Sequence, residues 1–378
     1  MSSIRPDGSF DSEHNQRFLP DSYASEYKSF LLSDDDLIIA MTDMAGDPKI
    51  LGVPTLVSNR NGRNFLMNQR VGKLFDFTEQ IYVPYLRYFL TSPLIKELYK
   101  NKGAGGLQIN ISKADILSVD VPFSNITEQQ RIVAILDQAF KGIAKARVNA
   151  EQNLQNARAL FESHLQSVFT QRGKGWMKNK LDSLTTKIGS GATPRGGEES
   201  YKAEGISLVR SMNVHDFGFK YAKLAFLDDA QAKELSNVEL KPNDVLLNIT
   251  GASVARCCIV PVDVLPARVN QHVSIIRPVS DKLDSSFLHY LLLSKPYKDK
   301  LLQTGSEGGS TRQAITKAQI QEFLIEYPPA IEDQKAIVHK LNEMLKETQR
   351  LEILYQRKIV LLDELKKSLL QQAFAGEL

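Results

Sequence analysis

A stretch of about 43 residues occurs twice in this chain of 378 residues, and this repeat limits the possible folds more than any other feature. The first copy opens with "EQQRIVAILD" (128–137), and the second opens with "DQKAIVHKLN" (333–342). Near each opening, four residues recur at an offset of 205 positions: Gln129, Ile132, Val133 and Leu136 as Gln334, Ile337, Val338 and Leu341. Near each end, four more recur at the same offset: Ser163, Leu165, Gln166 and Phe169 as Ser368, Leu370, Gln371 and Phe374. A duplication of this kind predicts two similar halves.

Both copies of the repeat are predicted to be long helices. Apolar residues follow three-and-four spacing through residues 127–170 and again through 333–374, which is typical of a helix with one apolar stripe. Thr127 and Gln130 match a capping box at the first helix start. A helix of ~43 residues would be ~65 Å long. An apolar stripe of that length needs an equally long partner, so we expect the two helices to pack antiparallel about a pseudo-twofold axis.

The segments between the helices also resemble each other and are predicted to be mixed α/β. "DLIIAMT" (36–42) resembles "DVLLNIT" (244–250), and "NQRV" (68–71) resembles "NQHV" (270–273). Strands are expected in "DVLLNIT", "CCIVPV" (257–262) and "VSIIRPV" (273–279), a short helix over 286–304, and a hairpin turn at 60–63. The predicted class is α+β, with globular domains at 1–124 and 172–329 and long helices at 125–171 and 330–378.

The first globular segment lacks one part of the second. The second copy contains a run from Trp176 to Ile206 that has no counterpart before Arg5, which falls opposite Arg210. About 32 residues are missing by this alignment. We therefore expect the first globular domain to be truncated at its N-terminal end.

Composition favours a folded cytoplasmic protein. The chain is 42% hydrophobic and 24% charged, with a net charge of +3 that permits nucleic-acid binding without demanding it. No apolar run approaches the ~20 residues of a membrane-spanning helix, and the polar start lacks the apolar region of a signal peptide. The two cysteines, Cys257 and Cys258, are adjacent and predicted to lie in the core, so no disulfide framework is expected.

Motifs for catalysis are missing from the sequence. No Gly-rich phosphate-binding loop ends in Gly-Lys-Ser/Thr, no Gly-x-Gly-x-x-Gly follows a strand, and no Asn-Pro-Pro-aromatic tetrad of an amino-methyltransferase occurs. The six histidines lack the spacing of metal ligands. The chain is therefore predicted to be a non-catalytic, duplicated binding protein. Double-stranded DNA suits such a protein because it offers two sites on one face, ~34 Å apart per turn.

The order of these segments resembles the specificity subunit of type I restriction-modification systems. The resemblance covers essentially the whole chain and rests on "TEQQRIVAILD", "EDQKAIVHKLN", "IGSGATP" (188–194), "NQHVSIIRP" (270–278), "GGSTRQAITKAQIQEFLIEYPP" (308–329) and the final "SLLQQAFAGEL". It implies two target recognition domains, each reading half of a bipartite DNA site, with the helices fixing the gap. It also implies two docked methylation subunits and further restriction subunits, so S-adenosylmethionine, ATP and Mg would bind only to those partners.

Polar loop residues are the candidate DNA contacts. Arginine can bind guanine bidentately, glutamine can bind adenine, and lysine can bind phosphates. The candidates in the second domain are Thr311, Arg312, Gln313, Ser190, Thr193, Arg195, Arg210, Asn213, Lys178 and Lys180, and those in the first domain are Arg60 and Arg63. For each of them an ordinary solvated turn is the alternative. The recurring "NQ" pairs (68–69 and 270–271) are expected to serve the fold, because domains that read different bases should differ at their base contacts.

Two alternatives to a subunit of a methylation and restriction complex stay open at this point. The chain could serve a methylation-only or other phage-defence complex that does not cleave DNA. It could also be an interaction scaffold in which the long helices only join partner proteins.

Overall fold

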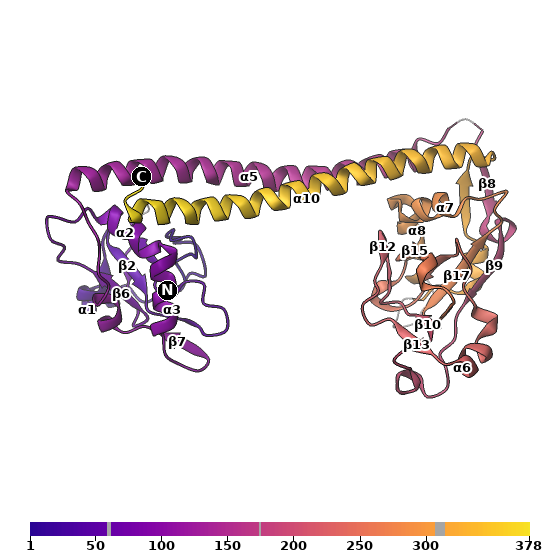
Figure 1. Ribbon diagram of the computed structural model, residues 1–378, viewed down its shortest axis with the longest axis horizontal. Helices are drawn as coiled ribbons and strands as arrows, with labels where there is room; N and C mark the ends of the chain where they lie inside the picture. The colour runs from indigo at the N-terminus through magenta and orange to yellow at the C-terminus, as the bar shows by residue number, and fades with distance from the viewer. Residues whose placement is uncertain (59–61, 174, 307–313) are drawn as a thin grey trace. The chain divides into compact units, whose positions relative to one another are not determined.

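The computed structural model describes residues 1–58, 62–173, 175–306 and 314–378, and the chain divides into two compact units. Unit 1 comprises Met1–Asn153 and Tyr355–Leu378, and unit 2 comprises Leu154–Leu354. Both units contain part of α5 (Ile126–Thr170) and part of α10 (Ile331–Ala375), the two long helices of Figure 1. Unit 1 is therefore built from two segments that are distant in the sequence, whereas unit 2 is one continuous segment.

Unit 1 is built on a three-stranded antiparallel sheet. Strand β2 (Leu37–Ala40) lies between β4 (Pro54–Leu56) and β6 (Val71–Leu74). Two further strand pairs are β1 (Leu31–Leu32) with β5 (Phe65–Leu66), and β3 (Thr42–Met44) with β7 (Gln108–Asn110). The helices before α5 are α1 (Ser22–Glu26), η1 (Lys28–Phe30), α2 (Val83–Thr91), α3 (Pro93–Lys102) and α4 (Lys113–Leu117).

Unit 2 is built on a four-stranded sheet with the order β15-β14-β17-β9. These strands are β15 (Cys257–Ile259), β14 (Val245–Asn248), β17 (Val273–Pro278) and β9 (Thr185–Ser190). Strand β10 (Ile206–Val209) lies between β13 (Ala225–Leu227) and β16 (Ala267–Val269) in a second sheet. Two strand pairs complete the set, β18 (Leu324–Tyr327) with β8 (Met177–Lys180) and β11 (Val214–His215) with β12 (Gly218–Phe219). The helices are α6 (Asp229–Glu234), α7 (Ser285–Leu293), α8 (Lys295–Ser306), α9 (Lys317–Gln321) and the short 3-10 helices η2 (Leu181–Leu184), η3 (Gly197–Ser200), η4 (Ser236–Val238), η5 (Gly251–Ser253) and η6 (Val262–Val264).

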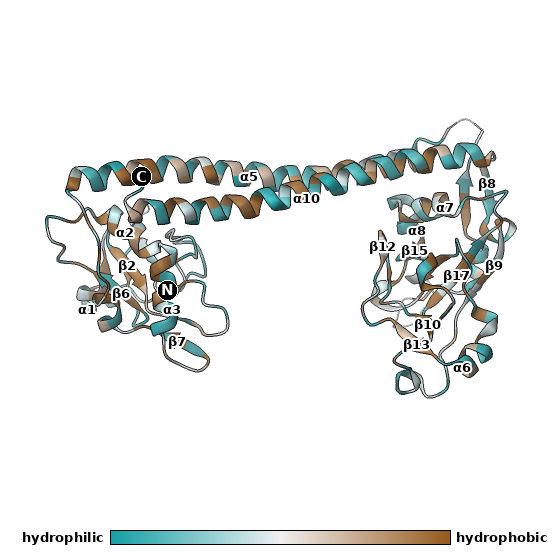
Figure 2. Cartoon of the chain, viewed as in Figure 1, coloured by the Kyte–Doolittle hydropathy of each residue, from teal (hydrophilic) through white to brown (hydrophobic). Residues whose placement is uncertain are grey.

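The central strand of each unit is buried on both faces. In unit 2, Val245 and Leu247 join one apolar cluster while Leu246 joins another, because successive side chains of a strand point to opposite faces. In unit 1, Leu37 and Ile39 join one cluster while Ile38 joins another. Figure 2 shows hydrophobic residues along β2 and both kinds of residue alternating along the long helices. The predicted α+β class and the two-domain organisation are confirmed.

The two long helices pack antiparallel within each unit, as predicted. In unit 1, Arg131 donates to the carbonyl of Leu378, and Arg147 pairs with Asp363. In unit 2, Arg158 pairs with Glu352 at 3.3 Å. Residue numbers therefore rise along α5 as they fall along α10. Apolar residues line the same contacts, including Leu136 with Leu370 in unit 1.

Two local predictions were wrong. Helix α5 begins at Ile126, and the side chain of Asn125 accepts the N–H of Glu128 at 2.9 Å, so Asn125 caps this helix in place of Thr127. The helix expected over 286–304 is divided into α7 and α8 by Ser294, whose ψ of 140° is extended. Pro296 then lies in the first turn of α8, where the missing N–H costs no hydrogen bond.

Candidate nucleic-acid interface

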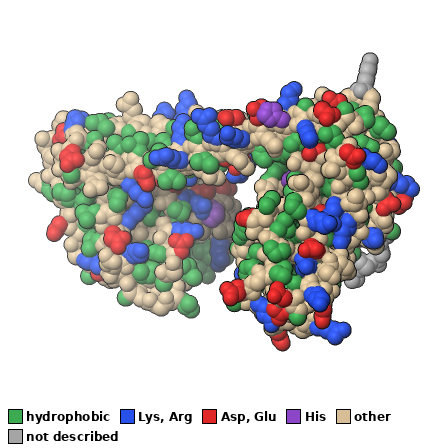
Figure 3. Space-filling view, turned by 45° about the vertical axis from the view of Figure 1, so that its right-hand side comes forward, with side chains coloured by type: hydrophobic (Ala, Val, Ile, Leu, Met, Phe, Trp, Pro, Cys, Tyr) green, Lys and Arg blue, Asp and Glu red, His purple; other side chains and the backbone are tan. Residues whose placement is uncertain are grey.

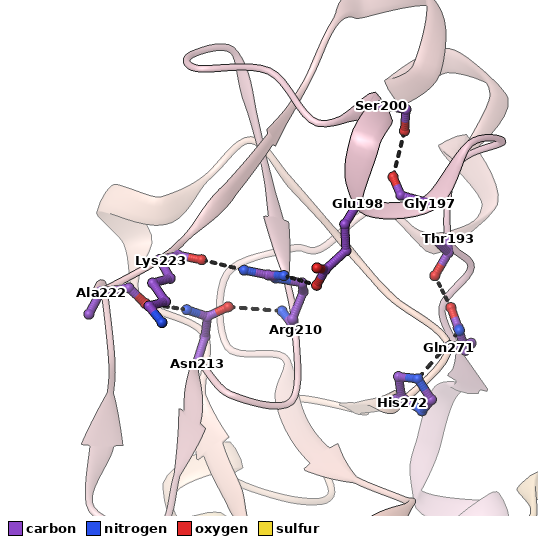
Figure 4. A network of polar contacts seen from close by, with 10 residues as sticks. All are labelled: Thr193, Gly197, Glu198, Ser200, Arg210, Asn213, Ala222, Lys223, Gln271 and His272. Atoms are coloured by element: carbon purple, nitrogen blue, oxygen red, sulfur yellow. Dashed lines mark hydrogen bonds and ion pairs between the residues drawn. The ribbon is translucent and has the colours of Figure 1, made fainter.

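Arg210 and Asn213 lie on a loop that directly follows β10 of unit 2. Asn213 is fully buried, and its carboxamide forms hydrogen bonds to the backbone of this loop and its neighbour. Its oxygen accepts the N–H of Arg210 at 3.0 Å (Figure 4). Its nitrogen donates to the carbonyl of Lys220 at 2.8 Å. The position of Asn213 therefore supports a role in holding the loop, and any direct contact with DNA stays a prediction.

The guanidinium of Arg210 is held by three groups. It donates to Glu198 at 2.7 Å and to the carbonyl of Lys223 at 2.7 Å, and it lies 5.3 Å from the ring centre of Tyr201. The side chain of Arg210 is 14% exposed, whereas that of Glu198 is 80% exposed. Glu198 therefore lies between the arginine and solvent, at the place where another anion could replace it.

A second loop, residues 190–195, lies against the turn that precedes β17. Thr193 donates a hydrogen bond to Gln271 of this turn (Figure 4). Gly191 is required there, because a Cβ at this position would lie 1.9 Å from the carbonyl oxygen of Val269. Ser190 and Arg195 are exposed on the same loop. Because glycine at position 191 lets the loop approach the backbone of Val269, the polar side chains of the "SGATP" sequence lie close to the turn before β17.

Two more loops join this cluster. The side chain of Asn248 donates to the carbonyl of Ser211 at 2.8 Å, which ties the Arg210 loop to the end of β14. Thr250 is 2.7 Å from the ring of His272 and forms a backbone bridge with Ala314. We call the four segments 190–200, 210–213, 248–253 and 270–272 the loop cluster. Thr311, Arg312 and Gln313 lie outside the described residues, although Ala314, which follows them, contacts this cluster.

The recurring "NQ" pairs form the same turn in both units. The side chain of Asn270 accepts the N–H of His272 at 3.1 Å, and that of Asn68 accepts the N–H of Arg70 at 3.2 Å. This agrees with a role of the two asparagines in the fold. Gln271 nevertheless takes part in the loop cluster through Thr193, which the sequence reasoning missed. Glu198 and Tyr201 were also missed, because nothing in their local sequence marks them as partners of an arginine.

The predicted lysine contacts lie on a different sheet. Lys178 and Lys180 belong to β8 and pair with Glu326 at 3.7 Å and Glu322 at 2.5 Å. Their charges are thus balanced by carboxylates beside β18, away from the four loops of the cluster. In unit 1, Arg63 pairs with Glu13 at 2.8 Å, and Arg60 lies outside the described residues. The structure therefore gathers Ser190, Thr193, Arg195, Arg210 and Asn213, but not the lysines.

Charge alone does not mark a DNA-binding face. In the view of Figure 3, acidic and basic side chains are interspersed over both units. The cluster is defined instead by convergent hydrogen-bonding groups on loops, and groups of this kind read the edges of bases. None of the helices in the described ranges is long and apolar enough to cross a membrane.

The family follows from comparison with known proteins. Residues 12–152 and 173–357 match the model of the type I restriction modification DNA specificity domain, and the chain belongs to this family. The specificity subunit of the type I restriction enzyme EcoBI from Escherichia coli is 21% identical over 338 residues, which cover 83% of this chain and 69% of that subunit. The StySPI specificity subunit from Salmonella potsdam is 22% identical over 312 residues, covering 78% of this chain and 65% of that subunit.

Two solved structures share the fold. One is a chain of a type I R-M system studied for its complex assembly and conformational transition, with a TM-score of 0.73, 20% identity, and coverage of 92% of this chain and 83% of that chain. The other is the HsdS subunit from Thermoanaerobacter tengcongensis, with a TM-score of 0.60, 21% identity, and coverage of 92% and 82%. The fold predicted from the internal repeat, with two α+β domains and two long helices, is thus one that solved proteins adopt.

Proposed function

We propose that the chain is the DNA sequence-recognition subunit of a type I restriction-modification complex. One observation carries the proposal: the family's DNA specificity domain matches the chain twice, once over each unit. Each unit would read one half of a bipartite site. In unit 2 the loop cluster supplies the reading side chains, with Thr193, Arg195 and Arg210 offering hydrogen bonds and positive charge.

The long helices are proposed to set the spacing between the two half-sites. Each helix has 45 residues, which corresponds to ~67 Å at ~1.5 Å per residue. Their exposed faces would also dock two methylation subunits, through charged residues such as Lys346 and Arg350. Restriction subunits would join that core.

The catalytic chemistry would belong to these partners. We propose that S-adenosylmethionine binds to the methylation subunits, that ATP and Mg bind elsewhere on partner subunits, and that this chain binds none of them. Adenine methylation and ATP-dependent cleavage would then be activities of the assembled complex. Assembly takes place in the cytoplasm, where the target DNA and the partner subunits meet.

The proposal is tested by co-expressing the chain with its methylation subunit and mapping methylated adenines by long-read sequencing. We expect one bipartite, asymmetric motif whose two halves are separated by a gap of fixed length. A half-site or a palindrome would show that unit 2 alone reads sequence. No methylated motif, in a complex that still assembles, would favour an interaction scaffold and contradict the proposal.

A further inference from the structure

Unit 1 contains a pocket of about 490 Å³ that is lined by lysines from three separate segments. Lys96 and Lys100 belong to α3, and Lys366 and Lys367 belong to the last turns of α10. Lys49 lies on the loop that leads into β4. Segments that are distant in the sequence thus bring five positive charges to one concave surface.

The carboxylates of the pocket neutralise these lysines only in part. Asp7 accepts two hydrogen bonds within its own turn, at 3.0 Å and 2.7 Å, and Asp363 pairs with Arg147. Glu97 is the third carboxylate of the lining. Among the described residues, Lys49 is the one lysine of the five that forms an ion pair, with a neighbouring aspartate at 3.4 Å. The pocket therefore has an excess of positive charge.

Lys96 shows the effect of this excess. Partial burial, together with the charges of Lys366 and Lys367, lowers the pKa of Lys96 below its ordinary value. Like charges that lie close together disfavour one another, and an anion between them removes this repulsion. Lys96 is nevertheless exposed, so a ligand can reach its ammonium group. These three lysines therefore form a site that an anion would stabilise.

The corresponding lysine of unit 2 already has an anionic partner. Helices α2 and α7 correspond at an offset of 202 positions, since each begins directly after the residue whose N–H the buried glutamine of its unit accepts. Lys96 on α3 then corresponds to Lys298 on α8, which pairs with Asp216. In the described part of unit 1, Lys96 has no such partner. The same position is thus paired within unit 2 and available to an external anion in unit 1.

The two lysines of α10 have counterparts that are not basic. At the repeat offset of 205, Lys366 corresponds to Phe161 and Lys367 corresponds to Glu162. Phe161 packs on Phe217 with ring centroids 5.8 Å apart. Residues that the repeated fold needs recur in both units, whereas these lysines do not. Their presence in unit 1 therefore points to a ligand and not to the fold.

The pocket lies on the side of the sheet where both units have the same strands. Its loop leads into β4, the edge strand that corresponds to β15 of unit 2. The segment of unit 2 that has no counterpart in unit 1 contributes β9, at the opposite edge, and β8, which pairs with β18. The counterpart of β18, residues 119–122, lies against Leu94 and Leu98 in a different pocket. The lysine pocket is thus not the place that corresponds to this segment.

We propose that this pocket of unit 1 binds a phosphate group, at a place separate from the loops assigned to base reading. Lysine binds phosphate as a point charge, whereas carboxylates favour the planar fork of arginine, and the described lining contains no arginine. The phosphates of a DNA backbone and those of a free pyrophosphate or nucleotide present the same chemistry. Such binding needs no sequence recognition, so the site does not rest on the proposed function.

The test is acetylation of lysines in the full chain, measured residue by residue with mass spectrometry at constant ionic strength. Pyrophosphate at twice its Kd should slow the acetylation of Lys96 about threefold, while Lys358, exposed on α10 outside the pocket, keeps its rate. Lys367→Gln should raise the Kd about two- to fivefold, the range of an exposed ion pair. Lys358→Gln is the matched control and should leave the Kd unchanged. Circular dichroism compares the fold of both variants with that of the parent chain.

A DNA duplex of random sequence is the second arm and identifies the source of the phosphate. Protection of Lys96 by the duplex would make the DNA backbone the source, and protection by pyrophosphate alone would make it a free phosphate compound. No protection of Lys96 by either probe, or equal protection of Lys358, would overturn the site. Stronger protection by polyglutamate than by pyrophosphate would assign the pocket to an acidic protein segment and would also overturn the proposal.

Discussion

Arg210 is the best-defined candidate for DNA contact at the scale of single residues. Its guanidinium is fixed by the carbonyl of Lys223 and by the ring of Tyr201, while Glu198 neutralises it from the solvent side. A phosphate or a guanine edge presents the same acceptor geometry as the Glu198 carboxylate. Exchange of Glu198 for DNA would therefore need little movement of the arginine.

Replacing Glu198 should strengthen DNA binding. We expect Glu198→Gln to raise the affinity for a duplex with the mapped site a few-fold, because a competing negative charge is removed. Arg210→Ala should lower it and reduce the salt dependence by about one phosphate contact. Both are measured by fluorescence anisotropy over a series of salt concentrations. Asp299→Asn removes an equal charge on α8, where Asp299 pairs with Lys295, and an equal gain from this control would contradict the specific role of Glu198.

His289 makes the stability of unit 2 depend on pH. Burial lowers the pKa of His289 below its ordinary value, and the ring lies 2.9 Å from the carbonyl of Asp216 and 3.2 Å from that of Cys257. The unfolded chain would take up this proton near pH ~6.5. The neutral histidine therefore stabilises unit 2 above that pH, and this stabilisation is lost as the pH falls below it.

The pH effect can be measured through Trp176, the one tryptophan of the chain, which is partly buried and packs against the core of unit 2. Urea unfolding followed by its fluorescence should show lower stability at pH 5.5 than at pH 7.5. His289→Gln keeps a donor but cannot be protonated, so the difference between the two pH values should shrink. An unchanged difference would assign the pH dependence to other groups.

At the scale of elements, a buried glutamine explains why the helix opening is repeated. The carboxamide of Gln129 accepts the N–H of Tyr82 and donates to the carbonyls of Gln80 and Ser124. Gln334 accepts the N–H of Asp284 and donates to the carbonyls of Lys282 and Pro328. Each glutamine thus joins the start of a long helix to the start of α2 or α7.

A tyrosine forms a second tie about two turns further along each long helix. Tyr88 donates to Asp137 in unit 1, and Tyr290 donates to Asn342 at 2.6 Å in unit 2. Burial, aided by the hydrogen bond to Asp137, raises the pKa of Tyr88 to about 12, so the phenol stays a donor at neutral pH. The repeated sequence therefore encodes a joint between a helix and a domain.

Removing one glutamine should destabilise its unit clearly. We expect Gln334→Ala to lower the free energy of unfolding of unit 2 by ~2–4 kcal/mol, because a buried N–H and two carbonyls lose their partner. Lys335→Ala, the exposed neighbour, should change it by less than ~0.5 kcal/mol. The measurement is urea unfolding followed by Trp176 fluorescence. Equal effects of the two variants would show that the glutamine is not a structural tie.

The elements were easier to predict than the site. The apolar pattern over 127–170 and 333–374 gave the ends of both long helices to within two residues, since an apolar stripe repeated over forty residues has no other stable form. The strands at 245–248, 257–259 and 273–278 were also predicted, because they are apolar runs bounded by turn residues. The break at Ser294 and the partners of Arg210 depend on contacts between distant residues, which local sequence does not encode.

At the scale of the whole molecule, each unit is closed by both long helices. Unit 1 takes the start of α5 and the end of α10, and Phe374 packs there on Tyr85 and Phe89. Unit 2 takes the end of α5 and the start of α10, and Phe169 packs there on Phe287. The integrity of unit 1 therefore depends on residues 355–378 from the far end of the sequence, whereas unit 2 is one continuous segment.

Damage to the C-terminal end should therefore destabilise the N-terminal domain. We expect Phe374→Ala to lower the stability of unit 1 by ~1–3 kcal/mol, because this partly buried ring packs on Tyr85 and Phe89. Leu361→Ala, at a 50% exposed position of the same helix, should have little effect. Hydrogen exchange at residues 37–40 reports on unit 1, while Trp176 fluorescence should stay unchanged. Protection of 37–40 that survives the Phe374 substitution would contradict this dependence.

The return of α10 to unit 1 also fixes when this unit can mature on the ribosome. After Asn153 is made, more than two hundred residues must follow before Phe374 emerges, which takes roughly 10 to 45 s at ~5–20 residues per second. During that interval Tyr85 and Phe89 lack their aromatic partner. Unit 2 has no such delay, because it is one continuous segment and all its residues are made one after another. Unit 1 is thus begun before unit 2 but finished after it, and its nascent chain is the one of the two that a chaperone would have more time to bind.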